Sequence, residues 1–277
     1  MLTGNAALAG VLGWPVAHSK SPQVHGHWLQ DHGIDGAYVP LAVSPEHFAG
    51  AVPALRDLHF RGANVTVPHK ERTLAVCDRI DDHARRLGAV NTLVFDVDGI
   101  HGRNTDGVGF LDNLRQGAPH WRPDAGPAVV LGAGGAARAV LVALMDAGVP
   151  EIRLVNRTRE RAETLAGELG GPIAVRAWDA WASALDGAAL LVNTTSLGMT
   201  GEPPLPVELD TLPRDAVVND IVYRPLETEL LARARARGNP VVDGLGMLLH
   251  QARPGFAAWF GVEPEVTEDL RARVLAG

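Results

Sequence analysis

A glycine-rich turn between an apolar run and an Ala/Leu-rich segment constrains the fold of this chain more than any other feature. Residues 128–131 form the apolar run, Gly132, Gly134 and Gly135 follow it, and a helical pattern ends near Gly148. Glycine at a strand-to-helix turn lets the backbone approach a pyrophosphate, and the helix N-terminus offers N–H groups to it. The pattern favours a dinucleotide-binding loop, with tight packing of strand on helix as the alternative.

The residues after the next expected strand bear on which dinucleotide is bound. Residues 151–155 form this strand, and an NAD-binding fold usually ends it with Asp or Glu to hold the ribose 2′-hydroxyl. Here residues 156–161 follow, with three Arg and one Thr and no carboxylate at the strand end. Such side chains suit a 2′-phosphate, so we expect NADP as the cofactor. Alternatively, Thr158 caps a helix while Arg159 and Glu160 are solvated.

Strand and helix patterns alternate along the whole chain, which is typical of α/β domains with largely parallel sheets. Residues 116–127 hold three prolines and two glycines and interrupt this alternation as a linker or a long surface loop. A strongly helical pattern returns over residues 245–260. The remaining strands are expected at residues 8–12, 37–43, 62–67, 89–95, 189–192, 216–218 and 240–242.

Lys70 is the first candidate for acid/base chemistry. The chain has 25 Lys and Arg residues, and only Lys20 and Lys70 are lysines. Lysine can release its proton when it is partly desolvated, whereas arginine keeps its proton. Asp106 lies in a loop of small polar residues and is the expected partner, because a Lys–Asp pair can relay a proton while a nicotinamide carries a hydride. A surface lysine and a helix N-cap are the alternative interpretations.

Polar side chains near Lys70 suggest a small hydroxylated ligand. Ser19 and Ser21 lie where the first strand ends and a helix begins, with Ser21 as the expected N-cap; this position suits a carboxylate, and plain capping is the alternative. Asn64 and Thr66 lie one strand period apart on residues 62–67 and therefore share a face. Pro68 ends this strand, and we expect the next helix to open at residues 69–70.

Composition excludes several other classes. The net charge of −7 argues against partners such as nucleic acid or an anionic membrane surface, and Cys77 is the only cysteine. The sequence has no signal-peptide pattern and no apolar run of membrane-spanning length, so we expect a cytoplasmic protein. His18, His25, His27 and His32 invite a metal interpretation, but no ligand spacing supports one and we expect no metal.

Together the motifs resemble those of the shikimate dehydrogenase family over nearly the whole chain. The matching segments, in order, are Gly13-x-Pro-x-x-His-Ser-x-Ser-Pro22, Asn64-Val-Thr-Val-Pro-x-Lys70, Gly88-Ala-Val-Asn-Thr92, Asn104-Thr-Asp-Gly107, Gly132-Ala-Gly-Gly-Ala136, Asn156-Arg-Thr158 with Arg161, Asn193-x-Thr-Ser196, Asp220-x-x-Tyr223 and Gly246-Met-Leu-x-x-Gln251.

The resemblance implies a reversible, NADPH-dependent reduction of 3-dehydroshikimate to shikimate, in the biosynthesis of chorismate and aromatic amino acids. Lys70 and Asp106 would form the catalytic pair. The substrate would be held by Ser19, Ser21, Asn64, Thr66, Asn91, Tyr223 and Gln251 together with that pair. The cofactor would contact Gly132, Ala133, Gly134, Gly135, Ala136, Asn156, Arg157, Thr158 and Arg161, with Thr195, Ile221, Gly244 and Met247 near the nicotinamide and Asp82 at the cleft.

The resemblance also implies two α/β domains with a cleft between them. Residues 1–108 would form the substrate-binding and catalytic domain, with the C-terminal helices of residues 244–277 packing back on it. Residues 109–243 would form a Rossmann-like NADP-binding domain. We expect a monomer or a homodimer whose partner is a small-molecule substrate.

Two departures and two alternatives stay open. Many relatives have Phe where His69 stands and Asn where Gly26 stands. A protonated His69 would make Lys70 easier to deprotonate, but we favour a helix-start role.

One alternative function is an NAD-using quinate/shikimate dehydrogenase, which a strand-end carboxylate or Thr at position 21 would indicate. The other is a non-catalytic, cofactor-sensing relative, which loss of Lys70 or Asp106 would indicate.

Overall fold

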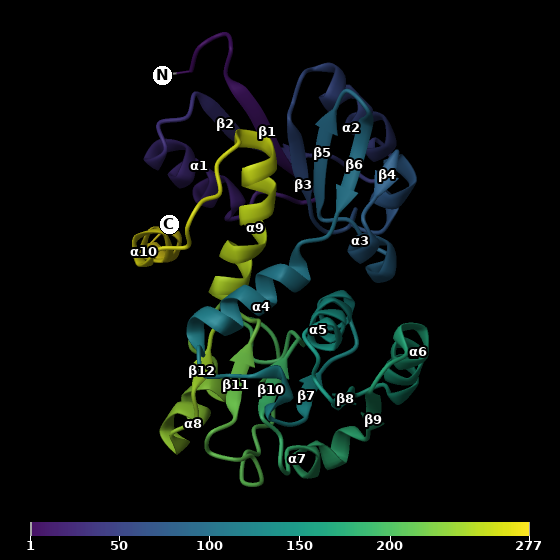
Figure 1. Cartoon of the computed structure of the whole chain (residues 1–277), viewed down its shortest axis with the longest axis vertical. Coiled ribbons are helices and arrows are strands. Elements are labelled where there is room, and N and C mark those ends of the chain that lie inside the picture. Colours follow the sequence, from purple (N-terminus) through teal and green to yellow (C-terminus); the bar gives the residue numbers. More distant parts are fainter. Residues whose placement is uncertain (1, 277) are drawn as a thin grey trace. The chain divides into compact units, whose positions relative to one another are not determined.

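The computed structural model describes residues 2–276, which divide into two compact units (Figure 1). Of the described residues, unit 1 comprises 2–105 and 249–276, and unit 2 comprises 106–248. The sequence predicted these divisions at 108/109 and 243/244. The observed division at 105/106 falls at the start of the helix Asp106–Gly117, and the division at 248/249 falls inside the helix Leu245–Phe260. A continuous helix carries no turn residues that would mark a boundary in the sequence.

Unit 1 is built on a six-stranded sheet with the order β2-β1-β3-β5-β6-β4. β1 pairs in parallel with β2 and β3, whereas β3–β5 and β5–β6 are antiparallel. The sheet is therefore mixed: β4 also pairs in parallel with β6, so three of its five pairings are parallel, and a two-residue turn joins β5 to β6 as an antiparallel hairpin. The strands are β1 (Ala7–Gly13), β2 (Gly36–Ala42), β3 (Gly62–Val65), β4 (Arg79–Ile80), β5 (Thr92–Asp96) and β6 (Gly99–Arg103).

The helices of unit 1 include two from the C-terminal part of the chain. Residues from 249 onward belong to unit 1. They are tied to it by two indole N–H groups: Trp259 donates to the carbonyl of Leu93, and Trp28 donates to that of Glu265, both at 2.9 Å. The helices are α1 (Ser21–Asp31), α2 (Phe48–Asp57), the 3₁₀ helix η1 (Arg72–Val76), α3 (Asp82–Leu87), α9 (Leu245–Phe260), which begins in unit 2, and α10 (Glu268–Ala276).

Unit 2 contains a six-stranded, wholly parallel sheet with the order β12-β11-β10-β7-β8-β9. Counted from β7, this is 3-2-1-4-5-6, the strand order of dinucleotide-binding folds. The chain reverses direction across the sheet between β7 and β10, which is where such folds bind their ligand. The strands are β7 (Ala128–Leu131), β8 (Ile152–Val155), β9 (Ile173–Arg176), β10 (Leu190–Asn193), β11 (Val217–Asp220) and β12 (Val241–Val242).

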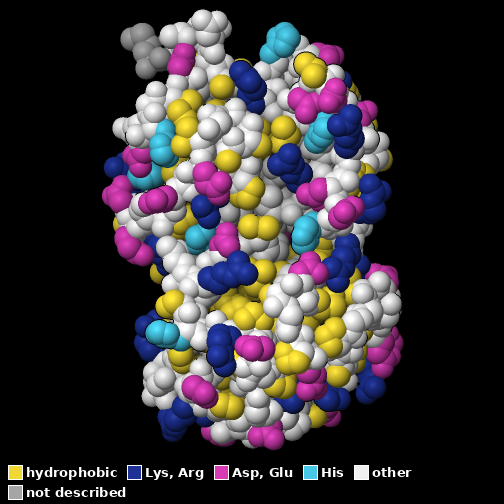
Figure 2. All heavy atoms as spheres, in the orientation of Figure 1, with side chains coloured by type: hydrophobic (Ala, Val, Ile, Leu, Met, Phe, Trp, Pro, Cys, Tyr) yellow, Lys and Arg dark blue, Asp and Glu magenta, His cyan; other side chains and the backbone are white. Residues whose placement is uncertain are grey.

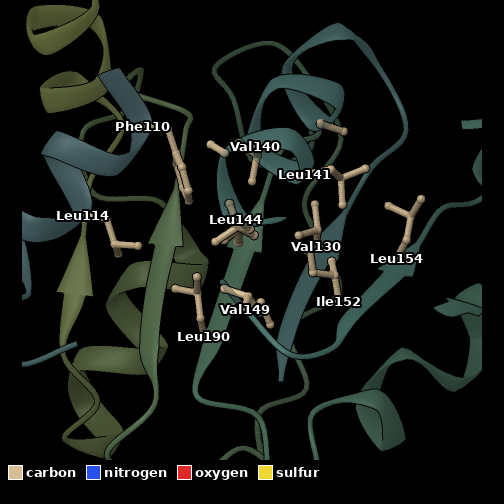
Figure 3. Close-up of a cluster of buried hydrophobic side chains, with 14 of the residues drawn as sticks. Phe110, Leu114, Val130, Val140, Leu141, Leu144, Val149, Ile152, Leu154 and Leu190 are labelled. Carbon is tan, nitrogen blue, oxygen red and sulfur yellow. The ribbon is translucent and has the colours of Figure 1, made fainter. Parts of the chain in front are cut away.

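The core of unit 2 explains why its strands are short apolar runs. All four residues of β7 are buried; Val130 packs into one cluster with α4 and α5, while Val129 and Leu131 pack into a second cluster on the other face. Figure 3 shows the first cluster, in which Phe110 and Leu144 come from helices. A strand covered on both faces has no polar side to alternate with. The helices are α4 (Asp106–Gly117), the 3₁₀ helices η2 (Pro123–Ala125) and η3 (Trp178–Ala180), α5 (Gly135–Asp146), α6 (Arg159–Leu169), α7 (Trp181–Ala184) and α8 (Glu229–Arg237).

The composition break at residues 116–127 lies inside unit 2, where it connects α4 to β7. On the face that Figure 2 shows, Lys and Arg side chains are interspersed with Asp and Glu side chains. No helix within residues 2–276 is both long and apolar enough to cross a membrane.

Candidate active site

The serine loop follows β1 and leads directly into α1. Ser21 is the first residue of α1, Lys20 is the N-cap, and the Lys20 side chain forms no capping hydrogen bond. The prediction that Ser21 is an N-cap is therefore wrong. Instead the backbone N–H of Ser21 donates to the Ser19 hydroxyl oxygen at 3.3 Å, which holds the two serines together. Both serines therefore lie at the start of α1, a position that suits a carboxylate ligand.

Asn64 and Thr66 do not both lie on the strand, although the sequence predicted a strand over residues 62–67 that carries both. β3 ends at Val65, so Thr66 lies just beyond the strand; Pro68, two residues further on, has no N–H to continue the ladder. The Asn64 amide is bound on both sides within the protein. Its Oδ1 accepts the Tyr38 hydroxyl at 2.6 Å, and its Nδ2 donates to the Asn91 carbonyl at 3.3 Å and to Thr92 Oγ1 at 3.2 Å.

Asn91 stands at the centre of a second group of hydrogen bonds. Its Oδ1 accepts the Thr105 N–H at 3.0 Å and the Thr92 hydroxyl at 2.9 Å. A backbone N–H can only donate, so these bonds fix which end of the amide is oxygen. The Thr105 hydroxyl donates at 2.8 Å to the carbonyl of Gln251, another predicted substrate residue. Unit 1 thus brings Asn64, Asn91 and the backbone of Gln251 into one network.

Lys70 lies in a turn that backbone hydrogen bonds hold from both sides. The Lys70 carbonyl accepts the Val90 N–H at 2.9 Å, and the His69 carbonyl accepts the Thr73 hydroxyl at 2.7 Å and the Thr73 N–H at 3.0 Å. The next helix along the chain is η1, which begins at Arg72. The expectation that a helix opens at residues 69–70 is therefore wrong.

His69 is a packed structural side chain. It is 0% exposed, its ring stacks on Phe48 with centroids 4.4 Å apart, and its Nε2 lies 2.7 Å from the Val43 carbonyl. That carbonyl can only accept, so Nε2 carries the proton. Burial lowers the pKa of His69, so the ring is neutral near pH 7. A neutral ring cannot promote deprotonation of Lys70, and the helix-start role is also wrong.

The other predicted substrate residues lie on different parts of the chain. Asp106, 8% exposed, is the first residue of α4 and of unit 2. Tyr223 follows β11 in unit 2, and Gln251 lies in α9 within unit 1. Asp82 is the exposed first residue of α3, where a carboxylate favours a helix N-terminus, and this local role is sufficient to explain it.

The glycine loop after β7 fits a dinucleotide. Gly132 has φ +111°, and a Cβ there would lie 2.7 Å from Thr194 Oγ1, so packing alone requires this glycine. A Cβ at Gly134 or Gly135 would meet no atom within 4 Å, so packing does not require these two. α5 begins at Gly135 with no side-chain cap and no acid in its first turn. Open space and unopposed N–H groups are what a pyrophosphate needs.

The residues after β8 fit a 2′-phosphate. The Asn156 amide donates to the Thr158 carbonyl at 2.7 Å, which shapes the turn into α6. Arg159 is paired with Glu163 at 2.7 Å along the helix. The exposed side chains of Arg157 and Arg161 form no hydrogen bond or ion pair within residues 2–276. Two of the three arginines therefore remain suited to bind a phosphate.

A buried carboxylate organises the ends of β10 and β11. Asp220 accepts the Asn193 amide at 3.0 Å, the Val222 N–H at 3.0 Å and the Thr228 hydroxyl at 2.7 Å. Asn193 in turn accepts the Thr195 hydroxyl at 2.7 Å. Burial raises the pKa of Asp220 to about 6, against the effect of these donors. This network shapes the loops that carry Thr195 and Ile221.

The last two cofactor candidates have clear packing roles. A Cβ at Gly244 would lie 2.2 Å from the Ile221 carbonyl oxygen, so only glycine fits there. Met247 is buried in the core cluster of unit 2.

Within residues 2–276, no three His, Cys, Asp or Glu side chains are grouped so that they could hold a metal ion.

Sequence reasoning missed several residues of these networks. Thr92, Asn193 and Asp220 are polar residues at strand ends, and Thr105 lies directly before α4. All four lie inside recognised motifs, and this polar character was an available signal. Tyr38 had no such signal, because it lies in an ordinary apolar strand and its partner Asn64 is 26 residues away.

Two family models match the chain. Residues 11–93 match the model described as "Shikimate dehydrogenase substrate binding domain", and residues 123–198 match "Shikimate / quinate 5-dehydrogenase". The first covers most of the strands of unit 1, and the second covers the glycine loop and the arginine cluster of unit 2.

Similar proteins cover nearly the full length. The curated "Shikimate dehydrogenase (NADP(+))" of Paramagnetospirillum magneticum is 64% identical over 99% of this chain and 100% of its own. A crystal structure of shikimate 5-dehydrogenase from Thermus thermophilus in complex with NADP(H) and shikimate is 38% identical, with a TM-score of 0.86 over 98% and 99% of the two chains. Quinate dehydrogenase from Corynebacterium glutamicum in complex with NAD is 31% identical, with a TM-score of 0.90 over 98% and 99%.

Proposed function

The chain belongs to the shikimate dehydrogenase family, and we propose a division of labour among its own residues in the reaction of that family. It is an NADP-dependent oxidoreductase that acts on a CH–OH group, converting 3-dehydroshikimate to shikimate reversibly on the route to chorismate and aromatic amino acids. The proposal assigns substrate binding to unit 1 and cofactor binding to unit 2.

The observation that carries the assignment of unit 1 is its polar network. Shikimate is a small acid with three ring hydroxyls, and it needs several donors and acceptors held in fixed directions. Asn91, with its amide orientation fixed, and the serine pair offer such groups, and Thr66 and Gln251 extend the set. The hydrogen bonds of Asn64 support a role in holding Asn91 rather than in binding substrate.

Lys70 and Asp106 are assigned the proton transfer. When NADPH is bound, it supplies the hydride that reaches the C3 carbonyl carbon of 3-dehydroshikimate. The Lys70 ammonium then gives its proton to the carbonyl oxygen, which becomes the C3 hydroxyl, and Asp106 orients and stabilises the protonated lysine. The hydrogen bonds that hold the Lys70 turn support this role, because proton transfer requires a fixed donor position.

NADP rather than NAD is favoured by the arginines after β8. Arg157 and Arg161 carry charge without a partner among residues 2–276, and no carboxylate stands at the end of β8 to bind a ribose 2′-hydroxyl or repel a 2′-phosphate. The proposal includes no role for a metal. A cytoplasmic location and a monomeric or dimeric state remain predictions.

A quinate dehydrogenase that uses NAD is the second candidate, because such an enzyme from Corynebacterium glutamicum shares the fold at a TM-score of 0.90. Measuring kcat/KM for shikimate and for quinate, each with NADP and with NAD, distinguishes the two. We expect the highest value for shikimate with NADP. A higher value for quinate with NAD would overturn the proposal.

A further inference from the structure

Tyr38 lies at the junction of the polar network in unit 1. It belongs to β2, is 7% exposed, and its hydroxyl lies 2.6 Å from Asn64 Oδ1. The Asn64 amide nitrogen faces the Asn91 carbonyl, which can only accept, so the oxygen is the end that faces Tyr38. Tyr38 must therefore donate this hydrogen bond.

The hydrogen bond reaches a predicted substrate residue in two further steps. Asn64 Nδ2 donates to Thr92 Oγ1 at 3.2 Å, and the Thr92 hydroxyl donates to Asn91 Oδ1 at 2.9 Å. The Asn91 carbonyl and the Thr105 N–H set the direction of this series, because each has only one possible role. The Tyr38 hydroxyl completes the series by occupying the Asn64 oxygen, which holds the Asn64 amide against its Asn91 and Thr92 partners.

The ring of Tyr38 is held by packing. His25 stacks on it with centroids 3.9 Å apart and an interplanar angle of 7°, and His25 itself is surrounded by Trp28, Phe256 and Trp259. Burial lowers the pKa of His25 to about 3, so the ring beneath the tyrosine is neutral. The phenol is therefore a rigid, uncharged donor whose position depends on the aromatic cluster.

Tyr38 also contacts the serine loop. Burial raises the pKa of Tyr38 well above its usual value, and a hydrogen bond with the Ser21 side chain offsets part of this effect. The phenol therefore stays protonated at physiological pH. Its loss would leave the Asn64 oxygen without its donor and loosen the Asn64 amide, and substrate binding would have to restore the position of that amide.

We propose that Tyr38 is a positioning residue for substrate binding, which orients Asn91 through Asn64 and Thr92 without touching the substrate. This inference rests on the proposed function, because it takes Asn91 as a substrate ligand. It predicts a defect in shikimate binding and leaves the proton-transfer and cofactor steps intact.

The test is Tyr38→Phe, which keeps the ring and its stack on His25 and removes one hydroxyl. The loss of one network hydrogen bond should raise the Kd for shikimate, measured calorimetrically without cofactor, by about fivefold to tenfold. KM for shikimate should rise in parallel, while kcat and KM for NADP change by less than about twofold. An unchanged Kd for shikimate would overturn the inference.

Trp28→Phe is the matched control. Trp28 also packs on His25, and its indole N–H bonds the Glu265 carbonyl outside the network. This variant should lower Tm and leave the Kd for shikimate unchanged. If it raises the Kd as much as Tyr38→Phe does, looser packing of the aromatic cluster around His25 explains both effects and the inference fails.

A double-mutant cycle tests the route through Asn91. In an Asn91→Ala background, Tyr38→Phe should change the Kd for shikimate by less than about twofold, because the group that it positions is gone. If the two substitutions raise the Kd for shikimate independently, so that their fold-changes multiply in the double variant, the inference is contradicted. If wild-type protein fails to oxidise shikimate with NADP, the proposed function itself fails; if it does so and Tyr38→Phe binds normally, only the positioning role fails.

Discussion

At the residue scale, three buried ionisable side chains set the response of the protein to pH. Burial lowers the pKa of His25 to about 3 and lowers that of His69, and burial raises the pKa of Asp220 to about 6. The histidines bind protons more readily in the unfolded chain, so their contribution to stability is lost as pH falls below about 6.5. Asp220 has the opposite sign, because its folded form binds a proton more readily.

Replacing His25 by Phe isolates the histidine contribution. Between pH 7 and pH 5, the free energy of unfolding of wild type should fall relative to that of His25→Phe, with a slope approaching about 1.4 kcal/mol per pH unit below pH 6.5. Phe keeps the aromatic packing, and the effect of Asp220 cancels in the comparison. Denaturant titrations at four pH values measure the difference, and parallel pH profiles would show that His25 is not buried in its neutral form.

Two residues were placed wrongly because local helix signals alone were used. Ser21 and His69 were assigned in this way, yet the N-cap is Lys20 and the His69 ring bonds Val43, 26 residues away. The role of Asn64 stays a prediction, but its contact with Tyr38 on another strand could not be inferred from its strand position either. Partners distant in sequence decide such cases, and a single sequence does not reveal them.

At the element scale, the starts of α5 and α6 carry the cofactor assignment. Replacing Gly134 by Val would place a side chain in space that no protein atom fills, so the fold should survive while KM for NADP rises on the order of tenfold or more. Gly50→Val in α2 is the control, since a Cβ there also meets nothing within 4 Å. Equal effects of the two variants on KM for NADP would contradict the assignment.

The arginines at the start of α6 provide a second test. Arg157→Ala and Arg161→Ala should each raise KM for NADP by about tenfold, because each removes a charge-assisted contact to the 2′-phosphate. KM for NAD should stay within about twofold, since NAD lacks this phosphate. Arg159→Ala is the matched control, because Glu163 already pairs with Arg159. A comparable loss with NAD for all three variants would refute a phosphate-specific role.

Elements were predictable where the local pattern and the tertiary role agree. The buried parallel strands of unit 2 appear as short apolar runs; β7 matches its prediction residue for residue, and α9 does so as well. β9 was missed, because it is only partly buried. β3 is shorter than expected because its last predicted residues lead into Pro68, which cannot donate to the ladder.

At the scale of the whole molecule, the α/β class, the family and the cofactor that the sequence predicted are confirmed by the two sheets and by relatives of near-full length. The individual site residues stay predictions. Ordered motifs identify a family because each reflects a backbone or ligand requirement that many positions must meet together. They do not reveal which side chains touch the ligand and which hold the others in place.

The central claim is that a proton from Lys70 in unit 1 accompanies a hydride from a cofactor held by unit 2. The most direct measurement is therefore kcat for Lys70→Ala with 3-dehydroshikimate and NADPH, with the Kd for NADPH measured on the same preparation. We predict that kcat falls by about 10²- to 10⁴-fold while the Kd for NADPH stays within about twofold. Turnover like that of wild type would contradict the account.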